Sequence, residues 1–497
     1  MSTANNPAAT ATTGPPHPVR RRLVLAICCL SVGVTGINLT IVNVALPSIG
    51  RDLHASVSAL QWTVDAYSLV MACLLMLSGS MADRFGRKRI FQLGLSLFSL
   101  GSLLCGLAPG AGWLIAFCGL QGVGGSMLNP VAMSIIVSVF TDGRERARAI
   151  GVWGSVIGVT IAAGPVLGGL LVGGVGWRSV FWVNVPIGIA VLLLTRRFVP
   201  ESKAARARAF DPAGQALIVV LFASIVAATI EGPHRGWTNP WILGLVVLAV
   251  LALLGILTVE PRRSEPLVDL RFFRSPPFSG ANAIAVVMSA CLGGFLFLNT
   301  LYLQDVRHLS PLHAGLMIIP MAAGQAVAAT LSGRLLASRG PRLPLTLGGA
   351  LLAVGAFLLV PLAASTGTVH LLAAYAVFGL GAGMTSPPVT NTAVSGMPSD
   401  QVGVAGALVA SARQFGASIG VAVTGSIVAG TGTGFVDAGH TAWAVLGGCG
   451  LVALALGVVS TSGWAKAAAA RNGLRLAGAP IPRPRDDRAD LAEARTE

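Results

Sequence analysis

Three polar side chains stand inside long apolar stretches of this sequence, where each needs a chemical reason. Asp65 is the one acid clearly within such a stretch, Asn38 interrupts the uncharged run that starts at Leu23, and Arg413 lies well inside a late run. A carboxyl group can take up and release a proton, an amide can only exchange hydrogen bonds, and a guanidinium keeps its positive charge. Because ionisable groups are costly in apolar surroundings, Asp65 and Arg413 are candidates for function.

Other chemistry finds little support in the sequence. It has no cluster of His, Asp, Glu and Cys at metal-ligand spacing, no glycine-rich phosphate loop and no Ser/His/Asp set. The seven cysteines are scattered through apolar runs, and we interpret them as small buried residues. We therefore expect no metal, no cofactor and no enzymatic activity, and ATP-driven work would require a second protein.

Composition shows which elements must position these residues. The 497 residues are 54% hydrophobic and only 11% charged, whereas soluble proteins carry about 25% charged residues. Apolar runs longer than about 18 residues recur along the chain, and each is long enough for a membrane-spanning helix. Fourteen spans are predicted, at residues 23–46, 60–80, 90–108, 112–139, 149–172, 179–198, 213–231, 240–259, 278–303, 313–336, 343–364, 370–394, 402–428 and 440–464.

The net charge of +15 follows the predicted topology. Nearly all of the 34 lysines and arginines fall on the side that holds both termini, and only Arg51, Arg178, Arg235 and Arg307 lie opposite. By the positive-inside rule both termini are predicted to be cytoplasmic, and the number of spans is even. The basic surface then faces anionic headgroups of the lipid bilayer, and no nucleic acid partner is expected.

Two loops indicate an internal repeat. Residues 79–88 read GSMADRFGRK and residues 333–342 read GRLLASRGPR, with the same spacing between their glycines. Each follows the second span of a six-span block, so the chain divides into two related halves, a design used by transporters. The predicted organisation is a disordered cytoplasmic N-terminus over 1–19, a six-helix bundle over 20–200, a two-helix insert with cytoplasmic linkers over 201–274, a second six-helix bundle over 275–464 and a disordered cytoplasmic tail over 465–497.

Several stretches together resemble one family. The 79–88 loop is similar to the signature loop between spans 2 and 3 of the major facilitator superfamily. Stretches that resemble its 14-span drug:proton antiporter branch are ALPSIGRDL at 45–53, QWTVDAYSL at 61–69, GPVLGG at 164–169, WRSVFWVNVPIG at 177–188, LYLQDVRHLSPLHAGLMIIP at 301–320 and RQFGASIGVAV at 413–423. The resemblance covers about residues 23–464. It implies an all-α membrane protein with the major facilitator fold, which is two six-helix bundles plus two inserted helices.

The resemblance gives the 79–88 loop the role of a cytoplasmic gate. Its glycines permit a tight turn, Asp83 would favour the positive end of a helix in the other half, and Arg87 would pair with Asp142. The alternative is a charged loop set only by topology. Ala337 replaces the aspartate in the second-half copy, so the gate is expected on one side only. The residues assigned to the gate are Gly79, Asp83, Arg84, Gly86, Arg87 and Asp142.

The fifth predicted span carries a glycine-rich motif that exporters of this family have and importers generally lack. Its small residues allow helices to approach closely, and Pro165 permits a bend. The resemblance therefore implies export, against the alternative of an ordinary packing face. The motif residues are Gly158, Gly164, Pro165, Gly168 and Gly169.

The chain departs from the family in two places. Asn38 stands where the family usually has an acid in span 1, and Cys118 stands where it usually has an arginine, three residues before Gln121. Loss of one partner of a buried charge pair costs about 3–5 kcal/mol, whereas loss of both can be nearly neutral. Asn38 is expected to bond Gln121 or a substrate, or only to tie two helices together. The usual proton site is thereby in doubt.

Asp65 remains as the proton-coupling candidate, at a place in span 2 where the family often has an acid. Proton exchange near neutral pH requires burial that disfavours the ionised form. The alternative is a permanently ionised aspartate that reaches toward the outer surface. The predicted depths of Asp65 and Arg413 differ by roughly 14 Å at the rise of an α-helix, so the two should not pair directly. Backbone carbonyls or a water-filled cavity would then serve Arg413.

The resemblance also implies a largely apolar cavity between the two halves. The predicted cavity residues are Asn38, Gln121, Met127, Phe295, Asn299 and Arg413. The predicted protein is a monomeric, proton-coupled exporter of small amphipathic drugs and antibiotics in the inner membrane of a bacterium. Two alternatives stay open: a dedicated exporter of one endogenous metabolite, coupled to protons or not, and a non-transporting membrane sensor that kept the fold.

Overall fold

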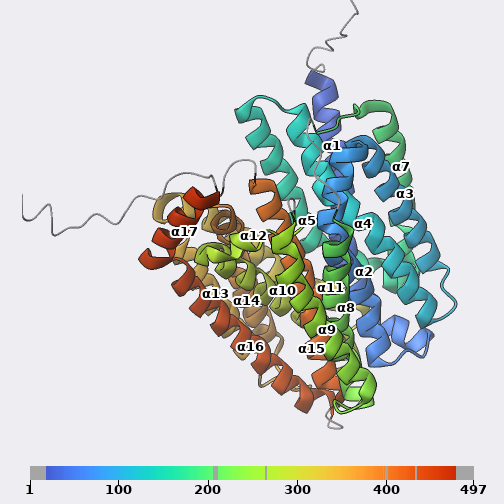
Figure 1. Cartoon of the computed structure of the whole chain (residues 1–497). Coiled ribbons are helices and arrows are strands. Elements are labelled where there is room, and N and C mark those ends of the chain that lie inside the picture. The colour runs from blue at the N-terminus through green and yellow to red at the C-terminus, as the bar shows by residue number, and fades with distance from the viewer. Residues whose placement is uncertain are drawn as a thin grey trace, which may run out of the picture.

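The computed structural model describes residues 18–204, 211–263, 266–395, 397, 401–430 and 434–476, which contain helices and no β-strand (Figure 1). The first half holds α1 (Pro18–Asp52), α2 (Val57–Phe85), α3 (Arg87–Gly106), α4 (Ala111–Val139), α5 (Gly143–Gly174), α6 (Ser179–Trp182) and α7 (Asn184–Phe198). An insert follows with α8 (Pro212–Arg235), α9 (Pro240–Val259) and the short helices η1 (Glu260–Arg262) and η2 (Leu270–Arg274). The second half holds α10 (Pro276–Leu301), η3 (Tyr302–Val306), α11 (Pro311–Met317), α12 (Ile319–Arg339), α13 (Arg342–Phe357), α14 (Thr368–Val394), α15 (Val402–Gly430), α16 (Phe435–Ser460) and α17 (Gly463–Leu476).

These helices lie where the spans were predicted, and the all-α prediction is confirmed. Thirteen helical segments of the described chain are long and apolar enough to cross a membrane, and the shorter apolar helix α13 occupies the remaining predicted span. The spans predicted at 179–198 and 313–336 are each broken into two helices. Pro186 and Pro320 lie in the first three residues after each break, where a missing N–H is tolerated.

Two hydrophobic cores gather these helices into two bundles. One core is built almost wholly from α1 to α7, and the other from α10, η3, α11 to α14 and α16. Figure 1 shows the N-terminal bundle in blue and cyan beside the C-terminal bundle in yellow to red. The bundles meet where α2 packs against α15 and where α5 packs against α11.

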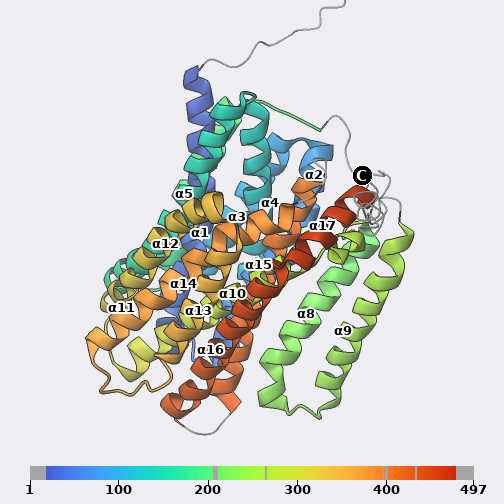
Figure 2. The ribbon, with the colours of Figure 1, turned by 90° about the vertical axis from the view of Figure 1, so that its left-hand side faces the viewer.

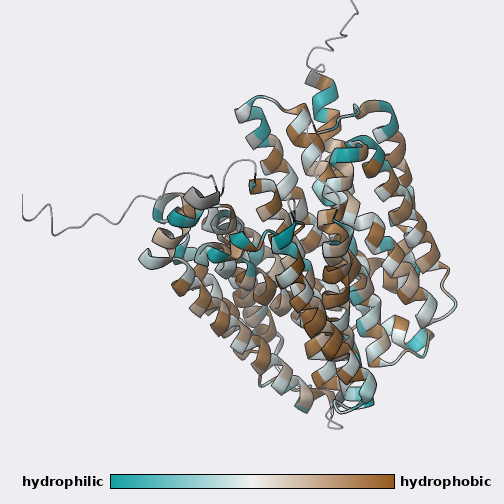
Figure 3. Cartoon of the chain, in the orientation of Figure 1, coloured by the Kyte–Doolittle hydropathy of each residue, from teal (hydrophilic) through white to brown (hydrophobic). Residues whose placement is uncertain are grey.

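The insert helices α8 and α9 stand as a pair at one edge of the molecule (Figure 2). α8 packs against both α2 and α15 and so touches both bundles, whereas α9 packs mainly on α8. Much of α9 is exposed leucine and valine, and the middle of the molecule is brown with apolar residues in Figure 3. Apolar helix faces of this kind are suited to contact with lipid tails.

The helices end at two faces. We call the face with the start of α1 and the loops at 140–142, 199–204 and 340–341 the N-terminal face, and the opposite one, with the loops at 53–56 and 307–310, the far face. α17 covers the beginning of the tail that was predicted to be disordered, so residues up to 476 are helical. Residues 1–17 and 477–497, which complete the two predicted loose ends, lie outside the described residues.

Candidate functional site

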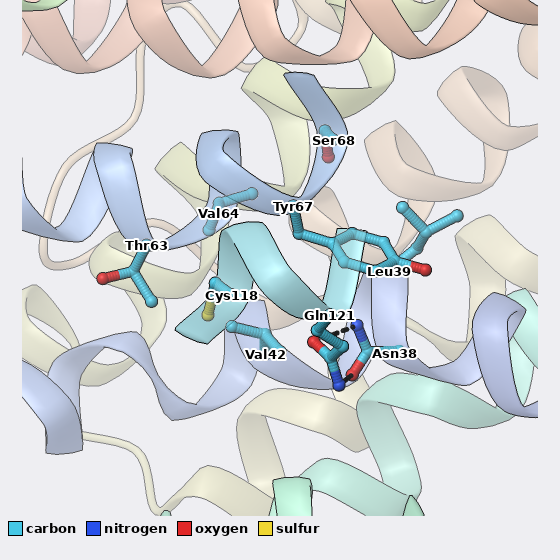
Figure 4. Close-up of a pocket in the computed structure, with 9 residues that line it drawn as sticks. All are labelled: Asn38, Leu39, Val42, Thr63, Val64, Tyr67, Ser68, Cys118 and Gln121. Carbon is cyan, nitrogen blue, oxygen red and sulfur yellow. Dashed lines mark hydrogen bonds between the residues drawn. The ribbon is translucent and has the colours of Figure 1, made fainter. Parts of the chain in front are cut away.

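Asn38 lies in a buried network of uncharged side chains in the N-terminal bundle (Figure 4). Its Nδ2 donates to Gln121 Oε1, and Gln121 Nε2 donates back to Asn38 Oδ1, both at 3.1 Å. Gln121 Nε2 also donates to Ser102 Oγ at 2.6 Å, and Asn184 Nδ2 donates to Asn38 Oδ1 at 3.1 Å. The predicted Asn38–Gln121 bond is confirmed. Ser102 and Asn184 were not foreseen, although Asn184 belongs to the WRSVFWVNVPIG stretch.

A small cavity of about 10 Å³ adjoins this network. Its walls include Asn38, Gln121, Thr63 and Cys118, and Figure 4 shows the amide pair on one side of it. A cavity of this size has room for about one water molecule. In this conformation the amides therefore bond one another rather than an organic molecule, and α1, α3, α4 and α7 are joined without a charge.

Asp65 is fully buried on α2 at the contact with α15. Ser418 of α15 lies beside the carboxyl group, yet neither carboxyl oxygen has a partner in hydrogen-bond geometry. Within the described part of the chain no Lys or Arg nitrogen lies within 4.0 Å of it. A buried carboxylate without a partner costs several kcal/mol, so this arrangement suits the protonated acid.

Arg413 lies half-buried on α15 and reaches α14. Its Nη2 donates to Ser386 O and Thr390 Oγ1, both at 3.0 Å, and its Nη1 donates to Ser386 Oγ at 3.4 Å. Among the described residues it forms no ion pair, with Asp65 or any other acid. A backbone carbonyl thus serves Arg413, as one of the two sequence-based alternatives predicted.

Three contacts that sequence reasoning missed join the bundles near the far face. Gln61 Nε2 of α2 donates to two carbonyl oxygens of α15, at 2.8 and 3.2 Å. Gln304 Nε2 of η3 donates to Val44 O of α1 at 2.9 Å, and Arg51 pairs with Asp305 at 3.4 Å. Both glutamines lie in stretches that resemble the antiporter branch, but the sequence does not show which carbonyl accepts.

The glycines of the α5 motif lie at close helix contacts. A Cβ added at Gly164 would collide with Thr40 of α1, and one at Gly168 would come within 3.0 Å of Ile41. Small residues at these positions let α5 pack closely against α1 inside the N-terminal bundle.

The same motif also reaches the C-terminal bundle. A Cβ at Gly169 would lie 2.6 Å from Leu312 Cα, and a Cβ at Gly315 of α11 would collide with Pro165 O. The backbones of α5 and α11 are therefore in contact at the far-face end of α5. This contact involves both bundles and leaves no room for a side chain.

Toward the N-terminal face, this side of α5 is open. A shallow, open cavity of about 710 Å³, lined by α5 alone, lies along it, and a Cβ at Gly158 would meet open space. The cavity residues are Arg148, Gly151, Val152, Ser155, Val156 and Val159. With 3.6 residues per turn, Gly151 and Ser155 lie on the same helix face as Gly169, and the other cavity residues widen this face to one side. The α5–α11 contact is thus closed at the far face and open toward the N-terminal face.

The sequence matches the Major Facilitator Superfamily over residues 28–421. The chain belongs to this superfamily. Relatives of this major facilitator protein include the Multidrug resistance protein Stp of Mycobacterium tuberculosis, at 38% identity over 78% of this chain and 72% of the relative. The Tetracenomycin C resistance and export protein of Streptomyces glaucescens is 36% identical, over 84% of this chain and 78% of the relative.

Solved structures agree on the major facilitator fold. A bacterial homologue of the human lysosomal transporter Spinster matches with a TM-score of 0.60 at 19% identity, over 93% of this chain and 99% of that one. The nucleoside transporter NupG matches with a TM-score of 0.60 at 12% identity, over 89% and 100%. The protein is a multi-pass bacterial membrane transporter rather than an enzyme, as predicted.

The major facilitator signature loop is bonded within its own bundle. Gly86 has a φ of 111°, which favours glycine, and Asp83 pairs with Arg87 at 3.0 Å. Asp142 caps α5 by accepting two backbone N–H groups of its first turn. The expected Arg87–Asp142 pair is therefore absent from the described residues, because each side chain has a nearer partner. The gate function of this loop stays a prediction.

The remaining predicted residues lie apart from one another. Gly79 borders open space, and Arg84 is exposed. Met127 packs between α4 and α3 in the N-terminal core. Phe295 belongs to an aromatic cluster of the C-terminal core, and Asn299 accepts a hydrogen bond from a tyrosine of α14. A role for the last three in a substrate cavity also stays a prediction.

Proposed function

We propose that this transporter exports small amphipathic drugs or antibiotics from the cytoplasm in exchange for protons, as a monomer with both termini in the cytoplasm. The names of its relatives support drug export, since they include multidrug resistance, tetracenomycin C resistance and puromycin resistance proteins. The basic loops on the side of the termini support the orientation. In this orientation the N-terminal face is cytoplasmic and the far face is external.

Proton coupling rests on one observation, the burial of Asp65 without a partner at the contact of the two bundles. Protonation from outside would neutralise the carboxyl group and allow α2 and α15 to close over it. The external side is then sealed while the cavity along α5 is open to the cytoplasm. Binding of substrate from the cytoplasm and release of the proton to the cytoplasm would then favour the conformation that is open to the outside.

Because the network at Asn38 is neutral, Asp65 is the candidate for proton coupling among the described residues of the spans. One proton entering per cycle carries one charge, and a membrane potential of about 100 mV is worth about 2.3 kcal/mol per charge. That energy supports a concentration ratio of about fiftyfold. A dedicated carrier that uses no proton is the second candidate, because the same network has replaced the family's usual acid with an amide.

The test is efflux from proteoliposomes under an imposed pH gradient, with puromycin and an amphipathic dye as substrates. Asp65→Asn should abolish gradient-driven efflux and retain exchange of substrate for substrate, because the amide mimics the protonated acid. The matched control is Asp437→Asn, which changes an exposed acid at the start of α16 and should behave as wild type.

Three results would replace this proposal. Unchanged gradient-driven efflux in Asp65→Asn would remove Asp65 from the mechanism. Efflux by the wild type that survives a protonophore and a collapsed potential would identify the uncoupled carrier. Substrate binding without any flux would identify a sensor that kept the fold.

A further inference from the structure

Arg413 is half-buried on the cytoplasmic half of α15, and its hydrogen bond to Thr390 is exposed. Gly406 lies on the same helix face as Arg413, seven residues before it, and a Cβ there would meet nothing within 4 Å. On the neighbouring α14, Thr390 and Asn391 are exposed. The guanidinium therefore lies against α14, beside exposed polar residues of that helix and an open glycine surface of α15.

The groups that hold this guanidinium are neutral. Ser386 contributes its carbonyl and hydroxyl oxygens and Thr390 its hydroxyl, while Nε of Arg413 has no partner. Hydrogen bonds to neutral groups fix the side chain in place but leave its full positive charge uncompensated. A charge far inside a membrane protein usually has a counter-charge, because an unpaired one is costly.

The acids that could supply this counter-charge on the cytoplasmic side are engaged elsewhere. Of those that the structure describes there, Asp83 pairs with Arg87, and Glu145 pairs with Arg21. Asp142 caps α5, and further acids are used as follows: Asp211 caps α8, Glu201 pairs with Arg89 and Asp269 pairs with Arg271. Glu260, buried at the end of α9, accepts a hydrogen bond from Val268 N through Oε2, while its Oε1 has no partner. The cavity along α5 has an arginine, Arg148, and no acid among its lining residues.

We propose that the missing counter-charge is supplied by the substrate, and that Arg413 binds an acidic group on an amphipathic organic anion. This inference rests on the proposed function, since it names the substrate class of the same exporter. A planar guanidinium pairs well with a carboxylate or a similar oxyanion, and such bonds are stronger than those to neutral acceptors. The apolar part of the anion would lie against valine and glycine surfaces like those along α5.

A cationic substrate would find few groups here that could bind it. Asp65 is closed off between α2 and α15, and Asn38 is neutral and bonded on both sides of its amide. A positive amine near Arg413 would meet repulsion without a compensating acid. The preference for anions follows from these charges and does not depend on the size of the substrate.

The test uses three compounds of nearly equal shape: naphthoic acid, naphthamide and naphthylmethylamine. Binding to the purified full-length protein in nanodiscs is measured by equilibrium dialysis. The wild type should bind the acid at least about tenfold more tightly than the amide or the amine, since hydrogen bonds between charged partners are the stronger ones. Arg413→Gln should weaken binding of the acid by about tenfold or more and leave the amide unchanged.

Two further variants separate recognition from structure. Arg413→Lys keeps the charge and should retain part of the preference for the acid. Arg307→Gln is the matched control, because Arg307 is also part-buried and bonded to a backbone carbonyl, of Thr366, but lies at the external face. It should leave the preference unchanged. Equal loss of acid and amide binding in Arg413→Gln would show a structural role and overturn the proposal, as would tightest binding of the amine.

Flux measurements separate this inference from the proposed function. In proteoliposomes with an imposed potential, the three compounds differ in the net charge moved per transport cycle. Export of the anionic acid in exchange for a proton moves two charges, export of the neutral amide moves only the charge of the proton, and export of the cationic amine moves no net charge. Acid flux should therefore depend most steeply on the potential. If the wild type binds the acid selectively but moves none of the three, export is rejected and the anion site stands. If flux is present and favours the amine, export stands and the anion site is rejected.

Discussion

The two contacts between the bundles are built in different ways. The α2–α15 contact contains side chains that can exchange partners: Gln61 reaches two carbonyl oxygens of α15, and Asp65 is buried nearby. The α5–α11 contact is made by backbones that approach at Gly169 and Gly315, and the same face of α5 opens onto a cavity of about 710 Å³. The α2–α15 contact therefore holds a titratable group, whereas the α5–α11 contact is closely packed at one end only.

This difference assigns the two contacts to different steps. A hydrogen bond contributes about 0.5–1.5 kcal/mol net, so breaking one changes the stability of the contact by only a modest amount. A contact between backbones tolerates no added atom, and overpacking costs about 1–3 kcal/mol or more. α8 also packs against both α2 and α15, so that side is held by a third element. We infer that proton chemistry occurs at the α2–α15 contact, while separation at α5–α11 opens the external side.

The largest effect is expected at Gly169. In Gly169→Val the new side chain meets Leu312, so the external ends of α5 and α11 cannot close. Because about 1–3 kcal/mol shifts the ratio of two states by about 5- to 150-fold, efflux should fall at least about tenfold. Efflux is measured in proteoliposomes, and external opening by labelling a cysteine placed at Ser310 with an impermeant thiol reagent.

Gly173→Val is the control for this experiment. It lies one turn further along α5 and borders open space, so efflux and labelling should stay near those of the wild type. Normal efflux in Gly169→Val would mean that the α5–α11 contact is not needed for transport, and the contrast between the two contacts would fail.

An intermediate effect is expected at Gln61. Gln61→Leu removes two hydrogen bonds to α15 and should reduce efflux about fivefold through weaker external closure. Its pH dependence should match that of the wild type, because Asp65 is unchanged. Gln414→Leu, which loses only a 3.5 Å contact with Met71 Sδ, should lower efflux less than about twofold. A shifted pH profile in Gln61→Leu would tie this glutamine to the proton step.

How much of this arrangement could be read from the sequence depends on the scale of the question. Spans follow from the length of apolar runs, so the helices and their order were predictable, including the two inserted ones. The Asn38–Gln121 bond was predictable because Asn38 stands where the family usually has an acid, and Gln121 lies one turn from Cys118, which stands where the family usually has an arginine. In both cases one local pattern fixes the outcome.

Contacts that depend on relative helix position were not predictable. Arg87 was expected to pair with Asp142, but Asp83 lies one turn before it on the chain and pairs first. The choice of carbonyl acceptors for Gln61 and Gln304 depends on the axial offset between α2 and α15 and between η3 and α1. Sequence patterns fix which face of a helix is polar, and they do not fix that offset.

A smaller effect is expected at the bonds between α8 and the bundles. Trp62 Nε1 of α2 donates to Glu231 at 3.1 Å, and Ser426 Oγ of α15 donates to Thr229 O at 2.6 Å. Trp62→Phe and Ser426→Ala should each reduce efflux about two- to threefold, and the double variant should combine the two effects, since the sites are on different helices. Efflux equal to wild type in the double variant would show that α8 only packs at this contact.

The smallest effect is expected at the ion pair between the bundles. Arg51 and Asp305 are 3.4 Å apart, with side chains 62% and 45% exposed. Exposed pairs contribute about 0.2–1 kcal/mol and are screened by salt. Arg51→Gln should therefore lower efflux less than about twofold at low salt, and the difference should vanish at about 1 M salt. A larger loss of efflux that salt does not reduce would show that this ion pair is as important for external closure as Gly169 is. Charge would then matter at the external face as much as backbone contact does.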